Sequence, residues 1–313
     1  MKQKIKKLTP VIGILLFVYI LYQIDLRKML VILKSTNILL AVLATVVSLS
    51  IIFIMNLRWY TLIRSLGINF SYLESLKSLV KGITLGVVTP GKLGELYRTK
   101  YLMEKTDRSA GFTLSTVIVD RMLDAFTLLF LGSVCSLILI NLFLIKIPLW
   151  LVFLFSAVVI VCMIVFLNER HMGKLLRPLA NIFIPKRLKE KLKFEFKEFY
   201  KGVRKISLRT YIICFIFTLF VWLFNVISVY ILAKALKIDI AFAFLALVFP
   251  VMILVNLIPI SISGFGTIQA SCILLLGLVG VSSESAVALS FLLILVTMWI
   301  YALPGAVLYL IKK

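Results

Sequence analysis

The sequence predicts an all-α integral membrane protein with several membrane-spanning helices. Hydrophobic residues make up 62% of the chain, charged residues make up 15%, and the mean hydropathy is +1.11. A soluble domain of this composition would not stay in water. The apolar residues form long uncharged runs, and a helix needs about 20 such residues to cross a bilayer. Strands of a transmembrane barrel would instead alternate apolar and polar side chains, which this sequence does not do.

Six runs are long and apolar enough to cross the membrane. They cover residues 8–24, 37–57, 112–145, 148–167, 210–233 and 286–310. The first run follows four lysines, as a signal peptide does, but no small-residue cleavage site comes after it. We therefore expect a retained first span and a single membrane domain over residues 1–313.

Two further segments, 72–104 and 242–281, each carry a Pro/Gly break between two helical halves. The first break is at 89–98 and the second at 259–266. Each half is too short to cross the bilayer alone, so we expect both segments to be re-entrant hairpins. Irregular backbone at membrane depth survives only where protein or a wet cavity satisfies its polar groups.

The distribution of Lys and Arg predicts the topology. With a cytoplasmic N-terminus and six spans, six basic residues fall outside: Arg27, Lys28, Lys34, Lys146, Lys234 and Lys237. The other 29 of the 35 lie inside, as the positive-inside rule requires. The first hairpin then opens from the inside and the second from the outside, which is typical of an inverted repeat with a site near the midplane. We expect a cell-membrane protein with both termini in the cytoplasm.

The segment 169–209 carries 13 Lys and Arg against 4 Glu. Its apolar residues recur every three to four positions, at Leu188, Leu192, Phe196, Phe199, Val203 and Ile206. This pattern predicts a cytoplasmic amphipathic helix on the inner leaflet. It is either a solvated anchor or a surface that docks a partner or senses anionic lipid. The net charge of +22 is thus explained by topology and lipid headgroups, and we expect no nucleic-acid partner.

Ionisable groups at membrane depth cost roughly 2.5–3.5 kcal/mol each on insertion scales, so they are the first candidates for function. The first candidate cluster is Pro90, Gly91, Lys92, Gly94, Glu95 and Arg98. Its glycines allow a close approach of backbone to ligand, and the following helix presents N-terminal amides. With Lys92 and the Arg98 fork these features predict a lipid-phosphate cradle. The alternative is a tight turn in which Glu95 pairs with Arg98.

The second candidate cluster is Asp120, Arg121 and Asp124 in the inner part of the third span. Asp120 and Asp124 are one turn apart and share a helix face. They form either a structural clamp, which also steadies Arg98, or a direct ligand or proton site. Arg58 and Trp59, at the inner end of the second span, are interpreted as an interfacial anchor.

The third candidate cluster has hydroxyls, an amide and freed backbone but no charge. It comprises Pro259, Ser261, Ser263, Gly264, Gly266 and Gln269. Such a segment either lines a path for a headgroup or is a simple helix break, and the sequence does not favour one over the other.

No pattern of residues predicts catalysis or a metal. Cys135, Cys162, Cys214 and Cys272 lie in apolar runs without CxxC spacing, and His171 is the only histidine. The sequence contains no Ser/His/Asp arrangement for a triad and no nucleotide-binding loop. We expect a protein without cofactor or metal that is not an enzyme.

Taken in order, four motifs carry a family resemblance: Arg58-Trp59, residues 89–98, residues 119–124 and residues 259–266. Together they resemble the flippase-like transmembrane family that includes the membrane region of lysylphosphatidylglycerol synthases. The resemblance covers nearly the whole chain. It implies a lipid-handling domain, which in some relatives moves aminoacylated phosphatidylglycerol between leaflets, and it places this chain with stand-alone members that lack the synthase domain. The family often has a charged residue where this sequence has Thr267-Ile268-Gln269, so a cationic headgroup is not implied.

These observations favour a phospholipid or lipid-linked headgroup translocase. Its expected partners are anionic or phosphate-bearing membrane lipids. One alternative is a non-catalytic membrane partner of a separate glycosyltransferase or lipid synthase. A further alternative is a transferase that uses a lipid-linked donor, although the predicted outer segments hold only scattered acidic residues.

Overall fold

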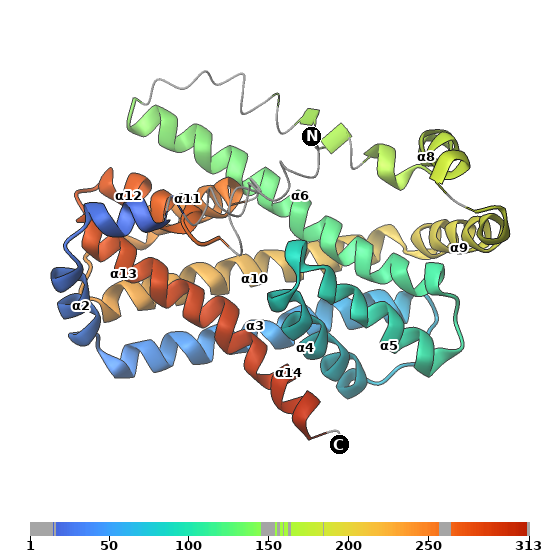
Figure 1. The fold of residues 1–313 in the computed structure, drawn as a ribbon, viewed down its shortest axis with the longest axis horizontal. Helices are drawn as coiled ribbons and strands as arrows, with labels where there is room; N and C mark the ends of the chain where they lie inside the picture. Colours follow the sequence, from blue (N-terminus) through green and yellow to red (C-terminus); the bar gives the residue numbers. More distant parts are fainter. Residues whose placement is uncertain are drawn as a thin grey trace.

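The computed structural model describes residues 15, 17–144, 154, 157–158, 160–161, 164–183, 185–256 and 264–311. Within these residues all regular structure is helical, which confirms the predicted all-α class. The elements are α2 (Leu26–Lys34), α3 (Ile38–Ser65), α4 (Tyr72–Val88), η1 (Pro90–Leu96), α5 (Tyr97–Thr106), α6 (Ala110–Leu142), α8 (Glu169–Phe183), α9 (Lys186–Lys205), α10 (Leu208–Ala235), α11 (Phe242–Val255), α12 (Thr267–Gly277), α13 (Ser283–Ile294), η2 (Leu295–Trp299) and α14 (Ile300–Leu310) (Figure 1).

Four helices in the described residues are long and apolar enough to cross a membrane. They are α3, α6, α10 and the continuous run from α13 to α14, and they match four of the six predicted spans. The other two predicted spans, 8–24 and 148–167, lie largely outside the described residues, so the count of six stays a prediction.

The long helices begin where the sequence places a capping side chain. Asn37, Ser109, Ser207 and Ser282 precede α3, α6, α10 and α13, and each side chain accepts a hydrogen bond from a backbone N–H of the first turn. These bonds satisfy amides that a helix cannot satisfy itself. The sequence therefore fixes the first residue of each long helix.

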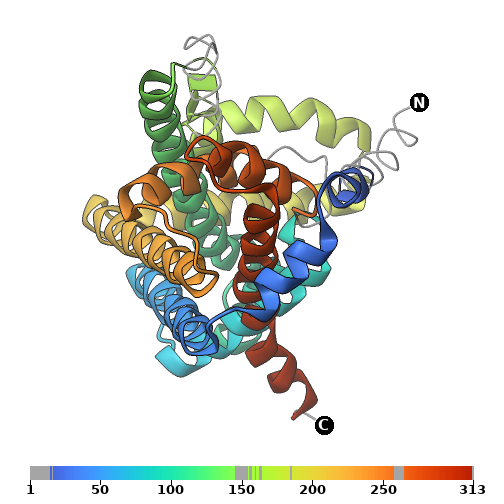
Figure 2. The same cartoon turned by 90° about the vertical axis from the view of Figure 1, so that its left-hand side faces the viewer.

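Helices α3 and α10 form the central pair, and they run antiparallel along the long axis of the molecule (Figures 1 and 2). Three contacts show the direction. Asn37 N donates to Ala235 O at 2.9 Å, Ser48 Oγ lies 2.9 Å from Ser228 Oγ, and Arg58 Nη1 donates to Thr218 Oγ1 at 2.9 Å. The partner's residue number falls as the number on α3 rises.

The helices that follow α3 and α10 repeat in the same order and at the same spacing. Helix α10 begins 170 residues after α3 (208 − 38), α11 begins 170 after α4 (242 − 72), and α12 begins 170 after α5 (267 − 97). Because α3 and α10 are antiparallel, the two halves are related by an approximate twofold axis across this pair. This is the arrangement of an inverted repeat.

Each half ends in a long helix that packs on the other half. Helix α6 lies against α11, where Gly132 faces Leu254, and α14 lies against α4, where Gly305 faces Thr84. The equivalence is residue for residue, since Gly305 follows Gly132 by 173 residues (305 − 132) as α13 follows α6 (283 − 110), and Leu254 follows Thr84 by 170. Small residues at such crossings let helices approach closely, which is how helices associate in lipid.

Both segments predicted to be broken helices are helix–break–helix pairs. The first consists of α4, η1 and α5, and the second of α11 and α12 with residues 257–263 outside the described chain. They lie at opposite ends of the α3–α10 pair (Figure 1). The placement of either pair as a re-entrant hairpin in a bilayer stays a prediction.

The predicted amphipathic helix is two helices, α8 and α9, rather than one. Phe199, Val203 and Ile206 at the end of its apolar stripe are buried, whereas Leu188 and Leu192 nearer its start are exposed. Only the second half of the stripe therefore packs on the protein.

The close crossing of α14 and α4 makes Gly305 the most sensitive glycine of the two. A Cβ there would lie 2.1 Å from Thr84 Oγ1 and 2.5 Å from Val80 O, whereas at Gly132 it would meet only the flexible Leu254 side chain at 3.0 Å. We expect Gly305→Ala to destabilise the protein by about 1–3 kcal/mol through overpacking, and Gly132→Ala by less. Thermal unfolding of the purified protein in detergent measures this. Gly277→Ala is the matched control, because nothing lies within 4 Å of its Cβ, and a loss there equal to that of Gly305→Ala contradicts the packing account.

Candidate functional site

Six charged side chains meet where α3, η1, α5 and α6 come together beside the start of α10. They are Arg58, Glu95, Arg98, Asp120, Arg121 and Asp124, and we call them the ion cluster. The three arginines and three carboxylates have a formal net charge of zero. Charges at membrane depth are tolerated when they are paired in this way.

Asp120 is the centre of the ion cluster, since it contacts all three arginines. Its Oδ1 accepts from Arg58 Nε at 2.7 Å, and its Oδ2 accepts from Arg98 Nη1 at 2.9 Å and from Arg121 Nη2 at 2.7 Å. Asp120 belongs to α6, Arg58 to α3 and Arg98 to α5. One carboxylate thus links three helices.

Arg58 extends the ion cluster to α10. Besides Asp120, its guanidinium donates to both carboxylate oxygens of Asp124, at 3.1 Å from Nη2, and to Thr218 Oγ1 at 2.9 Å. The guanidinium is completely buried, and these acceptors satisfy its fork in the bidentate geometry that arginine favours.

Arg98 and Arg121 complete the ion cluster from the side of η1. Arg98 lies over the Trp59 ring, 5.0 Å from its centroid, and its Nη2 is 3.4 Å from Glu95 Oε2. The same Glu95 oxygen is 2.9 Å from Arg121 Nη1. Trp59 is held in turn by donating from Nε1 to Thr116 Oγ1 at 3.1 Å.

Only one side of the ion cluster reaches the surface. The side chains of Arg58, Arg98 and Asp120 are at most 1% exposed, whereas those of Arg121 and Asp124 are each 31% exposed. Arg121 Nε is buried and has no hydrogen-bond partner among the described residues. A ligand can therefore reach the ion cluster at Arg121 and Asp124 without displacing its centre.

Three glycines let α4 approach the ion cluster and η1. A Cβ at Gly82 would lie 3.0 Å from Arg98 Cγ, and one at Gly86 would lie 3.0 Å from Glu95 Cγ. A Cβ at Gly94 would lie 2.2 Å from the backbone carbon of Leu85. In this structure Gly94 therefore serves the close contact between η1 and α4, where the sequence had suggested approach to a ligand.

The other residues of the predicted phosphate cradle lie apart from Arg98. Lys92 is exposed, with a positive φ of 56°, and Pro90 and Gly91 belong to η1 beside it. Arg98 is engaged by Asp120 and Glu95, so the geometry is that of the paired turn and of the clamp that steadies Arg98.

The interpretation of Arg58 as an interfacial anchor is wrong, because Arg58 is fully buried in the ion cluster. It lies seven residues before the end of α3 (65 − 58), and Arg64 occupies the last turn instead. The depth of Arg58 within a helix longer than the predicted span was the signal that the sequence reasoning missed.

The second break has polar groups without charge. Gly264 and Gly266 have positive φ values of 84° and 90°, and Gly266 N donates to Gln269 Oε1 at 2.7 Å. Thr267 Oγ1 donates to Asn256 Oδ1 at 2.7 Å across the break. Gln269 is fully buried, and its Nε2 has no partner among the described residues. Pro259, Ser261 and Ser263 lie outside the described residues.

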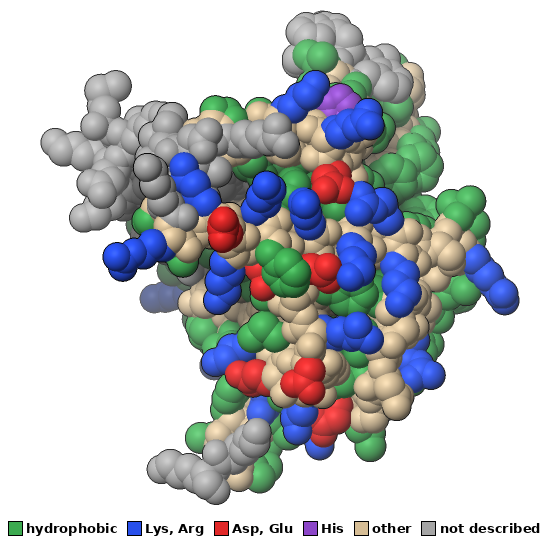
Figure 3. Space-filling model, turned by 90° about the vertical axis from the view of Figure 1, so that its right-hand side faces the viewer, with side chains coloured by type: hydrophobic (Ala, Val, Ile, Leu, Met, Phe, Trp, Pro, Cys, Tyr) green, Lys and Arg blue, Asp and Glu red, His purple; other side chains and the backbone are tan. Residues whose placement is uncertain are grey.

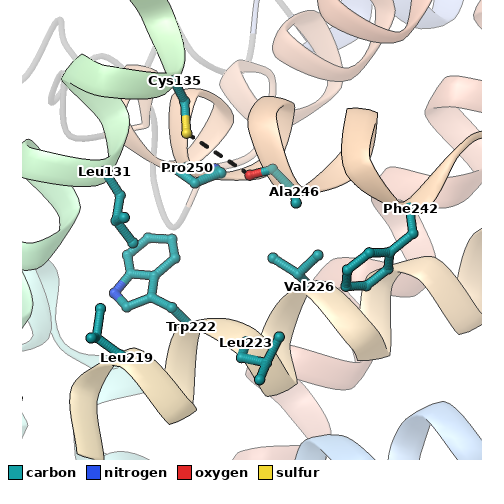
Figure 4. Close-up of a pocket in the computed structure, with 9 residues that line it drawn as sticks. All are labelled: Leu131, Cys135, Leu219, Trp222, Leu223, Val226, Phe242, Ala246 and Pro250. Carbon is teal, nitrogen blue, oxygen red and sulfur yellow. Dashed lines mark hydrogen bonds between the residues drawn. The ribbon is translucent and has the colours of Figure 1, made fainter. Parts of the chain in front are cut away.

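An apolar pocket of about 220 Å³ lies beside the ion cluster, between α6, α10 and α11 (Figure 4). It is lined by Leu131, Cys135, Leu219, Trp222, Leu223, Val226, Phe242, Ala246 and Pro250. Leu219 directly follows Thr218, and Leu131 is two turns, about 10 Å, beyond Asp124. The pocket suits hydrocarbon rather than a polar ligand.

Comparison with known proteins gives a consistent set of relatives. The family model described as lysylphosphatidylglycerol synthase TM region matches residues 8–305. A UPF0104 membrane protein of Methanocaldococcus jannaschii is 25% identical, with 100% of this chain and 97% of the relative covered. Another, from Methanothermobacter thermautotrophicus, is 25% identical over 87% of this chain and 85% of its own length. A third, from Pyrococcus horikoshii, is 24% identical over 97% and 96%.

The central position of Asp120 predicts a large effect of its removal. Asp120→Asn leaves Arg58 and Arg98 buried without their shared negative charge, and breaking buried pairs in this way costs about 3–5 kcal/mol. We expect a clear fall in the unfolding midpoint in detergent. Asp239→Asn is the control, since the Asp239 side chain is 97% exposed beside Lys234 and its loss should leave the midpoint unchanged. Equal midpoints for the two variants would show that the ion cluster does not stabilise the fold.

Proposed function

We propose that this chain, which belongs to the lysylphosphatidylglycerol synthase transmembrane-region family, binds phosphate-bearing membrane lipids and moves their headgroups between leaflets. The observation that carries the proposal is the pair of helix–break–helix segments at opposite ends of two antiparallel halves. In transporters, broken helices in inverted halves provide the polar site near the bilayer midplane.

In this proposal both helix–break–helix segments are re-entrant. Helix α4 has 17 residues and α11 has 14, which gives lengths of about 26 and 21 Å. The hydrocarbon core is about 30 Å thick, so neither helix crosses it alone. Each pair then enters and leaves on one face, and the breaks lie where other helices or water satisfy the backbone.

The ion cluster lies toward the cytoplasmic face in this orientation. Lys and Arg side chains gather over the end of the molecule formed by α5, α8 and α9 (Figure 3). The positive-inside rule places this end in the cytoplasm of a cell membrane, with the N- and C-termini on the same side. Lys312 and Lys313 lie outside the described residues.

The proposed headgroup site is the exposed side of the ion cluster. Arg121 offers a partly exposed guanidinium with an unpartnered Nε, and Lys92 on η1 adds an exposed ammonium. Arg98, Glu95 and Asp120 position Arg121 rather than touch the lipid. The apolar pocket beside Leu219 supplies a place for hydrocarbon.

At the second break, the proposed path for the headgroup has hydroxyls and amides only. Gln269, Thr267 and Asn256 offer weak, uncharged contacts there. A headgroup bound less tightly at one end than at the other can be released, which translocation requires.

A second candidate function is docking of a separate glycosyltransferase or lipid synthase. The observation in its favour is the basic outer surface of α9, which carries nine Lys and Arg against three Glu. A transferase acting on a lipid-linked donor is the less favoured third candidate.

Reconstitution into vesicles tests the proposed function. We expect fluorescent phosphatidylglycerol or a polyprenyl phosphate to change leaflet faster with the protein than in empty vesicles. Arg121→Gln should slow this by about tenfold or more, because a charge-assisted hydrogen bond contributes roughly 1.5–3 kcal/mol. Arg121→Lys keeps the charge but loses the fork, so it should be intermediate.

Lys100→Gln is the matched control, because Lys100 is an exposed cation of α5 paired only with Glu104 at 3.7 Å. It should translocate lipid as the unchanged protein does. If no anionic or polyprenyl lipid moves faster than in empty vesicles, translocation is wrong and the docking function is favoured.

A further inference from the structure

A second, larger cavity lies away from the ion cluster, between the first turns of α6, the start of α8 and the length of α9. Its volume is about 1740 Å³. The interior is mainly apolar, with Leu114, Ile118, Phe166, Phe196 and Phe199 among the lining residues. Pockets for small polar ligands are smaller, about 300–1000 Å³. The size and lining fit long hydrocarbon chains.

Direct contacts fix α9 against α6 and so shape this cavity. The Glu195 carboxylate accepts from Gly111 N at 2.5 Å. A Cβ at Gly111 would lie 1.9 Å from Glu195 O, and one at Gly202 would lie 2.2 Å from Ser115 Oγ, so the two helices touch through glycine at both points. The cavity is therefore built into the fold and does not depend on a loosely attached helix.

A hydrogen bond also ties α9 to the residues before α8. Tyr200 donates from its hydroxyl to Phe166 O at 2.6 Å. Burial raises the pKa of Tyr200 to about 12, so the hydroxyl remains a donor throughout the physiological range. Both walls of the cavity are thus held by the protein itself.

The charge along the cavity is positive. Lys174, Lys189, Lys193 and Lys197 are among its lining residues. Both lining carboxylates are already engaged, Glu195 by Gly111 N and Glu169 by an ion pair with Arg204. Lys193 and Lys197 are one helical turn apart and therefore lie on the same side of α9, where they can reach a single anion.

We infer that this cavity binds an anionic glycerophospholipid of the leaflet on which α9 lies, with its acyl chains in the apolar interior and its phosphate at Lys193 and Lys197. The exposed Leu188 and Leu192 continue the apolar stripe of α9 toward the bilayer and give the chains a way in. This site shares no residue with the ion cluster, and the inference does not require translocation.

Native mass spectrometry of the delipidated protein tests the inference. Phosphatidylglycerol and phosphatidylcholine with identical acyl chains are titrated in separate experiments. We expect phosphatidylglycerol to bind more tightly. Lys193→Gln with Lys197→Gln should weaken its binding by about tenfold or more, since each lysine near an anionic headgroup contributes about fivefold, and should leave phosphatidylcholine unchanged.

The control is Lys191→Gln with Lys201→Gln, which removes the same charge from the same helix at residues that do not line the cavity. This variant should bind phosphatidylglycerol as the unchanged protein does. Equal losses for the two pairs, or equal binding of the two lipids by the unchanged protein, overturn the inference.

A second variant tests the hydrocarbon part of the site. Leu114→Trp fills the apolar interior, so it should weaken both lipids while the unfolding midpoint shows that the protein stays folded. Soluble glycerol phosphate should not displace bound phosphatidylglycerol at equal concentration, because it lacks acyl chains. Displacement by glycerol phosphate, or unchanged lipid binding in a folded Leu114→Trp protein, would instead indicate a simple anion site and contradict the inference.

Discussion

The burial of three arginines and three carboxylates in one place is the constraint on which the inner half of this molecule depends. No single pair would suffice, because a buried ion that lacks a partner costs several kcal/mol. Asp120 meets this constraint by accepting from Arg58, Arg98 and Arg121 at once. Helices α3, α5 and α6 can therefore take few other relative positions. The glycines of α4 and η1 follow from the same constraint, since only residues without side chains leave room for Glu95 and Arg98.

The twofold arrangement makes the ion cluster more informative, because its equivalent in the other half has no charge. With the spacing of 170 residues, Arg58 corresponds to Ser228 and Arg98 to Ile268, and with the spacing of 173 Asp120 corresponds to Leu293. Ser228 contacts Ser48 in the same way that Arg58 contacts Thr218. One scaffold thus carries a tightly linked charged end and an uncharged end, which is the asymmetry that a directional lipid path requires.

Much of this architecture could be predicted from the sequence because its signals are local. Hydrophobic length located α3, α6 and α10, and Pro and Gly located both breaks. Side-chain partners were harder to predict. A window of 20 residues ended the second span at residue 57, so Arg58 was placed at the interface, although tertiary partners on α6 and α10 carry α3 two turns further. Gly94 was correctly singled out, but its close neighbour is Leu85 on α4, which spacing along the chain does not reveal.

The central claim is that the ion cluster joins α5 to α6 through a shared, buried charge pair. A double-mutant cycle on Arg98→Gln and Asp120→Asn, followed by equilibrium unfolding in mixed micelles, tests it most directly. The account predicts that the double variant loses less stability than the sum of the single losses, by about 1 kcal/mol or more, because both changes remove the same contact. Losses that add within about 0.5 kcal/mol, as expected for Arg98→Gln combined with the remote Asp239→Asn, would contradict it.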